Sequence, residues 1–166
     1  SDVYKRQVNK LLINANSGLS FFKSTSLPVR SDSCEGHLGP LAGILTAMEW
    51  TAREYPKIDY ILSAPVDNPF LPNDLVSELM AAKKGKNADI AVASSGSNVH
   101  YTVGIWPVEQ KDRLRSALLI EKVRRVEKWA NRHKLAIVDF GVGKIDPFTN
   151  INSPRCLAAA ASLLRN

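Results

Sequence analysis

A single carboxylate between two prolines is the strongest candidate for chemistry in this sequence. Asp67 follows the apolar run over residues 60–64 and lies between Pro65 and Pro69. The prolines restrict the backbone on both sides, so the carboxylate can be held firmly at the end of a strand. A lone carboxylate with open positions suits Mg²⁺, which keeps several waters and takes further ligands from substrate phosphates. An Asx turn, in which Asp67 bonds only to its own backbone, explains the same pattern, and both interpretations stay open.

A second group of polar residues lies near the start of the chain. Asn14 and Asn16 follow an apolar run, and Asp32 precedes residues 36–43, a segment with glycines at both ends. Glycines let the backbone approach a flat ligand, and the helix that follows presents free N–H groups that favour anions. Paired asparagines can contact a purine edge or a ribose, but they are also common in turns. The group therefore indicates either a nucleotide-binding loop or a plain loop-to-helix junction.

The other candidates for catalysis favour structural roles. His100 is a lone histidine, and no Ser/His/Asp or Cys/His arrangement can be inferred from the spacing of residues. Residues 141–144 read Gly-Val-Gly-Lys but lack the G-x-x-x-x-G-K-[ST] spacing of a phosphate-binding loop, so they predict a turn. Cys34 and Cys156 are far apart and have no metal-type spacing, which is typical of reduced thiols in a cytoplasmic protein.

The chain has 166 residues and a net charge of +6, and most of the excess positive charge lies in residues 111–134. A basic face suits a phosphorylated ligand, an acidic partner or nucleic acid. Glu121 and Glu127 are interleaved with the basic residues, which also fits a solvated helix surface. No aromatic side chains are spaced through the stretch as base-stacking platforms, so we expect no nucleic acid as partner. No apolar run approaches the ~20 residues of a membrane helix, and the polar start is not a signal peptide.

Strands and helices alternate along the chain, which predicts a single α/β domain with a mostly parallel sheet covered on both faces. The apolar and β-branched runs predict strands over residues 8–14, 28–30, 60–64, 88–93, 101–106 and 135–140. Helical periodicity predicts helices over residues 41–54, 72–84, 110–119, 123–133 and 153–164. The strand over residues 60–64 is expected to be buried on both faces, and Leu75, Leu79 and Met80 are expected to point inward.

Ligands of such sheets gather outside the carboxyl ends of the strands. Asn14, Asp32, Asp67, His100 and residues 150–152 each lie just past a predicted strand end. This rule directs attention to these residues as candidates for a ligand site.

Taken in order, six segments resemble one protein family. They are Ile13-Asn14-Ala15-Asn16, Asp32, Gly39-Pro40-Leu41-Ala42-Gly43, Pro65-Val66-Asp67-Asn68-Pro69-Phe70-Leu71-Pro72, His100-Tyr101-Thr102 and Phe148-Thr149-Asn150-Ile151-Asn152-Ser153-Pro154. Each segment alone is weakly specific, but the ordered series resembles the molybdenum cofactor guanylyltransferases. The resemblance implies a Rossmann-like, three-layer nucleotidyltransferase fold over residues 8–166, with residues 1–7 as a leader outside the family.

The resemblance also implies a reaction, the transfer of GMP from GTP to molybdopterin. A terminal phosphate of molybdopterin attacks the α-phosphate of GTP, and molybdopterin guanine dinucleotide and pyrophosphate are formed. By position, Asn14 and Asp32 would contact the guanosine, and Asp67 would bind both Mg²⁺ and the nucleotide. In phosphoryl transfer of this kind the protein mainly positions the reactants, while cations offset the developing charge.

The same resemblance implies a site for the second substrate. Asn150 and Asn152 would lie near the metal and molybdopterin, and Arg124 and Arg125 match an arginine-bearing stretch that could hold the pterin phosphate. Proteins that supply or receive the cofactor are possible docking partners.

The sequence departs from the family in two places. Tyr101 follows His100 where the family usually has proline. Residues 1–7 do not resemble the strand and loop of the type L-A-G-G-x-x-x-R-x-G-x-D-K with which the family begins, and the strand at Val8 matches the family's second strand. We therefore expect an N-terminally truncated copy of the family domain, in which the first strand and the glycine-rich loop are absent. That loop holds the phosphates with its N–H groups, so we expect weak GTP binding and little turnover.

Two other functions fit the sequence. A cytidylyltransferase or another nucleotidyltransferase of the same fold would share most of these segments, because the base-recognition loop lies partly in the unmatched region. A non-catalytic module could use the basic face around Arg124 to dock a partner.

Overall fold

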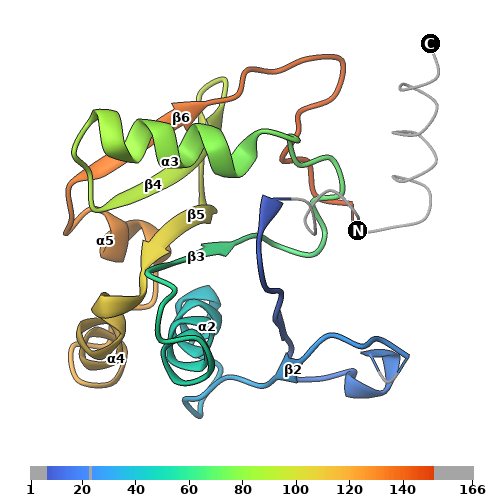
Figure 1. The fold of residues 1–166 in the computed structure, drawn as a ribbon, viewed down its shortest axis with the longest axis vertical. Coiled ribbons are helices and arrows are strands. Elements are labelled where there is room, and N and C mark those ends of the chain that lie inside the picture. The colour runs from blue at the N-terminus through green and yellow to red at the C-terminus, as the bar shows by residue number, and fades with distance from the viewer. Residues whose placement is uncertain (1–6, 23, 152–166) are drawn as a thin grey trace.

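The structure is a computed structural model that describes residues 7–22 and 24–151. Its strands are β1 (Ile13–Asn14), β2 (Val29–Arg30), β3 (Tyr60–Ser63), β4 (Ile90–Ser95), β5 (Asn98–Pro107) and β6 (Leu135–Asp139). β3, β5, β4 and β6 form a four-stranded sheet in that order, and β1 pairs with β2 in a separate two-stranded sheet (Figure 1).

The helices cover both faces of the four-stranded sheet, which confirms the predicted α/β layers (Figure 1). They are α2 (Pro40–Glu54), α3 (Leu75–Gly85), α4 (Lys111–Leu119) and α5 (Val126–Ala130), with short 3₁₀ turns η1 (Leu19–Phe22) and η2 (Val108–Gln110). Pro40 occupies the first turn of α2, where its missing N–H leaves no helical bond unmade. The last predicted helix, over residues 153–164, lies outside the described residues, as do Asn152 and Cys156.

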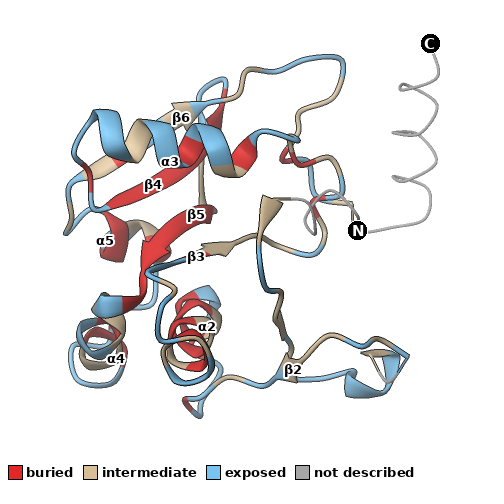
Figure 2. Cartoon of the chain, viewed as in Figure 1, coloured by how far each residue is buried: buried red, intermediate tan, exposed pale blue. Residues whose placement is uncertain are grey.

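β4 contributes side chains to two hydrophobic clusters, one on each face of the sheet. All of its residues are buried (Figure 2), and successive side chains point to opposite faces. Ile90 and Val92 pack in the cluster built with α2, α4 and α5. Ala91 and Ala93 pack in the cluster built with α3. This sheet with a helical layer on each side fixes the carboxyl ends of β3, β4 and β6 at one edge.

The direction of β5 differs from the prediction of a mostly parallel sheet. β4 and β6 are parallel, whereas β5 runs antiparallel to both β3 and β4. Only Gly96 and Ser97 connect β4 to β5, and so short a connection permits only an antiparallel hairpin. Gly96 has φ 54°, the left-handed conformation that such a hairpin turn requires. His100 therefore lies inside β5, and it reaches the expected edge because β5 starts there.

Two predictions about burial were wrong. Residues 60–64 are not buried on both faces: only Ile61 is buried in β3, because this strand is at the edge of the four-stranded sheet and has a single neighbour. β4, which the sequence also predicts as a buried strand, is buried on both faces. Met80 is 38% exposed, whereas Leu75 and Leu79 point inward as expected.

The strand predicted over residues 8–14 was too long. Only Ile13 and Asn14 form a ladder, with Val29 and Arg30 of β2. Within the part of the chain that the structure describes, residues 8–12 form no ladder with a neighbouring segment.

Gln7 attaches the start of the described chain to α3. Its side-chain amide donates to Pro72 O at 3.0 Å, and its Oε1 accepts from Val76 N at 3.0 Å. Gln7 thereby satisfies an N–H group of the first turn, since the N-cap residue Asp74 makes no capping bond with its side chain. None of the helices formed by the described residues is both long and apolar enough to cross a membrane.

Candidate functional site

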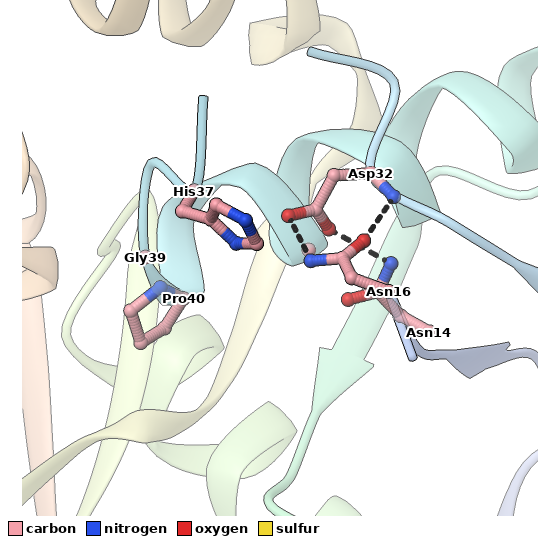
Figure 3. Close-up of a pocket in the computed structure, with 7 residues that line it drawn as sticks. Asn14, Asn16, Asp32, His37, Gly39 and Pro40 are labelled. Atoms are coloured by element: carbon pink, nitrogen blue, oxygen red, sulfur yellow. Dashed lines mark hydrogen bonds between the residues drawn. The ribbon is translucent and has the colours of Figure 1, made fainter. Parts of the chain in front are cut away.

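Two asparagines and an aspartate predicted from the sequence lie together at the end of the β1–β2 pair. Asn14 Nδ2 donates to Asp32 Oδ1 at 3.0 Å, and Asn16 Nδ2 donates to Asp32 Oδ2 at 2.7 Å (Figure 3). Asn16 Oδ1 accepts from the Asp32 backbone N–H at 2.8 Å. The parallel pairing of β1 with β2 brings these residues together, because both strands end at the same edge. The structure thus brings Asn14 and Asp32 into direct contact, at the end of a sheet separate from the one whose strand β3 precedes Asp67.

This cluster lines a cavity of about 290 Å³ at the start of α2. The other lining residues are His37, Gly39, Pro40 and Gly43. Gly43 is needed for the close approach, because a Cβ there would lie 2.5 Å from Asn14 Oδ1. The cavity therefore combines a carboxylate, two amides and the N-terminus of a helix, which together can accept from and donate to a nucleoside.

His37 lines the cavity although no pattern in the sequence singles it out. Its φ of 49° is unusual for a residue with a side chain, and its imidazole points toward the side of the cavity where Asp32 lies (Figure 3). Only the spacing of Gly36 and Gly39 around it hinted at a special backbone.

Asp67 lies past the carboxyl end of β3 in a turn closed by the bond from Asn68 N to Pro65 O at 3.4 Å. Its backbone oxygen accepts from Ile151 N at 2.8 Å. In the described part of the chain no hydrogen bond or ion pair involves the Asp67 carboxylate, so the side chain is not used for an Asx turn there. Asn150, which is exposed, directly precedes Ile151 in the chain, so its backbone passes close to that of Asp67.

A hydrogen-bonded chain that sequence reasoning missed lies behind this segment. Ser95 Oγ is 2.7 Å from His100 Nε2 and donates to Asp146 Oδ2 at 2.8 Å. Asp146 Oδ1 accepts from Phe148 N at 2.9 Å. Burial lowers the pKa of His100, and the charge of Asp146 offsets part of this effect.

The lowered pKa of His100 predicts how stability depends on pH. The unfolded chain, with the ordinary pKa of 6.5, binds the proton more readily than the folded chain. The free energy of unfolding should therefore fall as the pH drops through 6.5, and the loss should end below the folded pKa. Melting temperatures of the chain and of His100→Gln across this range test this, since the variant should lose that part of the pH dependence. Equal pH dependence in both proteins would contradict the prediction.

The two arginines of the predicted pterin-phosphate site differ in their surroundings. Arg124 donates from Nη1 to Leu118 O at 2.7 Å and to Val123 O at 3.1 Å, so part of its guanidinium holds the end of α4. Its backbone oxygen would lie 3.7 Å from a Cβ on Gly39, which places residue 124 beside the cavity wall. Arg125 is exposed, and within residues 7–22 and 24–151 its guanidinium forms one long ion pair, of 3.8 Å, with Glu127.

The chemistry of Asp67 fits a divalent metal that is completed by substrate. No group of three or more His, Cys, Asp or Glu side chains gathers to hold a metal in residues 7–22 and 24–151. Among the described residues the Asp67 carboxylate is partly exposed and has no hydrogen-bond or ion-pair partner, so it is open to a divalent cation that also takes waters and phosphates as ligands.

Known proteins share both the sequence and the fold. Residues 2–136 match the MobA-like NTP transferase domain family. The molybdenum cofactor guanylyltransferase of Rhodopseudomonas palustris (strain BisB5) is 42% identical over 154 residues, which are 93% of this chain and 73% of that protein. The one from Mesorhizobium japonicum is 43% identical over 163 residues, with 96% of this chain and 78% of that protein covered.

Two solved structures support the fold alone, because their identities are low. Molybdopterin-guanine dinucleotide biosynthesis protein A from Archaeoglobus fulgidus has a TM-score of 0.64 at 20% identity, covering 93% of this chain and 78% of that one. Rv0371C from Mycobacterium tuberculosis, in complex with manganese, has a TM-score of 0.62 at 15% identity, covering 95% and 80%. Given the family match over most of the chain and relatives above 40% identity, this chain belongs to the MobA-like NTP transferase family.

Proposed function

We propose that the nucleotidyltransferase domain, residues 8–166, transfers GMP from GTP to molybdopterin with Mg²⁺ as the metal. The observation that carries this proposal is the Asn14–Asn16–Asp32 cluster facing a cavity at the start of α2. Support for the substrates comes from the relatives named molybdenum cofactor guanylyltransferase.

In this proposal the cavity holds the guanosine. Each oxygen of Asp32 already accepts one hydrogen bond from an asparagine, and a carboxylate oxygen can accept a second. Asp32 can therefore accept from N–H groups of the base or from ribose hydroxyls without giving up its bonds to Asn14 and Asn16. This rigid arrangement positions the nucleoside before reaction.

The reacting phosphates lie, in the same proposal, between Asp67 and Asn150. Asp67 holds Mg²⁺, which when bound offsets the charge that develops on the phosphates. The terminal phosphate of molybdopterin attacks the α-phosphorus of GTP, the bond to the β-phosphate oxygen breaks, and pyrophosphate leaves. Asn150 and Asn152 contact the second substrate, and Arg125, with the free part of the Arg124 guanidinium, attracts its phosphate.

The direct experiment incubates the chain with GTP labelled on its α-phosphate, molybdopterin and Mg²⁺. Labelled molybdopterin guanine dinucleotide is the expected product, with no product from labelled CTP. Because the sequence predicts weak GTP binding, a chimera that carries the opening segment of the Rhodopseudomonas palustris relative is assayed in parallel. Transfer from CTP in preference to GTP, or no transfer by either protein, would contradict the proposed function. Replacing Mg²⁺ by Mn²⁺ in the same assay compares the two metals.

A further inference from the structure

The segment that carries Asn150 is attached to the rest of the molecule at two points. At its start, Asp146 bonds to Ser95 through Oδ2 and to the Phe148 N–H through Oδ1. Farther along, Phe148 O accepts from Asn68 Nδ2 at 2.7 Å and Ile151 N donates to Asp67 O at 2.8 Å. These two bonds, to Asn68 and Asp67, belong to the candidate site itself. The bond between Ser95 and Asp146 therefore positions the start of the segment that leads to Asp67.

Ser95 joins β4 to this segment and to β5 at once. Its side chain is buried at 1% exposure, at the last residue of β4. A hydroxyl has one hydrogen, which Ser95 Oγ donates to Asp146 Oδ2, so its contact with His100 must be one in which Nε2–H donates. The hydrogen bonds thus run in one direction, from His100 through Ser95 to the Asp146 carboxylate.

Packing reinforces the same anchor. The ring of Phe148, which is 4% exposed, lies 4.6 Å from the His100 ring at an interplanar angle of 34°. Phe140 packs edge-on against Phe148 at 5.6 Å. Burial keeps the pKa of His100 low, so the imidazole is neutral at neutral pH and its Nε2 proton is fixed by the bond to Ser95.

From this geometry we propose that Ser95, His100 and Asp146 are positioning residues that orient Asn150 beside Asp67 for the second substrate. None of the three touches the reacting atoms. They act through the 146–151 segment, whose position they fix relative to β4 and β5. The functional half of this proposal, that Asn150 is oriented for the second substrate, rests on the proposed function. The anchoring half, that the three residues hold the 146–151 segment against β4 and β5, is a property of the chain alone.

Hydrogen exchange tests the anchoring without any activity. In Ser95→Ala, the amides of Phe148 and Ile151 should exchange about tenfold faster, because Asp146 loses its bond to the sheet. Ser94→Ala is a matched control: Ser94 is the preceding residue of β4, also buried, and its Oγ donates to Val138 O rather than to the segment. Equal exchange of the two amides in both variants would overturn the anchor.

Substitutions of His100 separate its hydrogen bond from its bulk. His100→Gln keeps an N–H donor near the place of Nε2, so exchange at Phe148 and Ile151 should stay close to that of the unsubstituted chain. His100→Leu keeps an apolar side chain but no donor, and exchange should accelerate as in Ser95→Ala. If His100→Gln and His100→Leu behave alike, the hydrogen bond is not what positions the segment.

Steady-state kinetics test the functional half in the protein that carries out transfer. Ser95→Ala should raise KM for molybdopterin about tenfold and leave KM for GTP unchanged, because the guanosine cavity lies on other elements. A rise of both KM values, or of neither, would overturn the positioning role. Absence of transfer by the unsubstituted proteins counts against the proposed function, and the exchange experiment then still decides whether the anchor exists.

Discussion

Replacement of Asp67 by asparagine should lower GMP transfer by at least about 100-fold while leaving the fold intact. Asparagine keeps the shape of the side chain but removes the negative charge that attracts a divalent cation. The carboxylate has no hydrogen-bond or ion-pair partner in the described residues, so the free energy of unfolding should change by no more than about 0.5 kcal/mol. Mn²⁺ binding followed by electron paramagnetic resonance gives a readout that does not require turnover.

Asp59→Asn is the matched control for this experiment. Asp59 is an exposed aspartate just before β3, whereas Asp67 lies just past the other end of the same strand. The control removes the same charge from the chain without touching the proposed metal site. If both substitutions lower Mn²⁺ affinity equally, the effect is one of net charge. If Asp67→Asn retains full Mn²⁺ affinity and transfer, Asp67 is only a turn residue.

The sequence predicted the elements that position the site because their signals are local. Residues 40–54 have an N-terminal proline and apolar residues at helical spacing, and α2 forms there. Residues 90–93, Ile-Ala-Val-Ala, are apolar without interruption, and β4 is buried on both faces. Polar residues directly after strands mark the sheet edge, which is why Asn14, Asp32 and Asp67 could be selected without a structure.

The sequence could not predict contacts that depend on distant segments. Ser95 and Asp146 are 51 residues apart, and nothing in either neighbourhood indicates the other. The burial of a strand depends on how many neighbours it has, so β3, with one neighbour, is half-exposed although most of its residues are apolar. The antiparallel direction of β5 did have a local signal, the glycine in a connection of two residues, and that signal was missed.

Gly43→Ala should weaken nucleotide binding about 10- to 100-fold with almost no change in stability. Within α2, alanine is favoured over glycine by about 0.5–1 kcal/mol. The new Cβ would lie 2.5 Å from Asn14 Oδ1, which is the end of a flexible side chain, so Asn14 can move away. The movement breaks its bonds to Asp32 Oδ1 and Arg30 O. We therefore expect a loss of GTP affinity and not of folding stability. Titration of the protein with GTP measures this affinity.

Gly85→Ala separates this effect from the general effect of alanine in a helix. Gly85 ends α3, and a Cβ there would meet no atom within 4 Å, so the chain should be unchanged or stabilised by up to about 1 kcal/mol. GTP affinity should stay the same in this control. Because Asn14 yields instead of the backbone, the melting temperature of Gly43→Ala should lie close to that of the unsubstituted chain while its GTP affinity falls. A large fall in the melting temperature would show that α2 packs rigidly against the β1–β2 pair, and unchanged GTP affinity would mean that Asn14 does not contact the nucleotide.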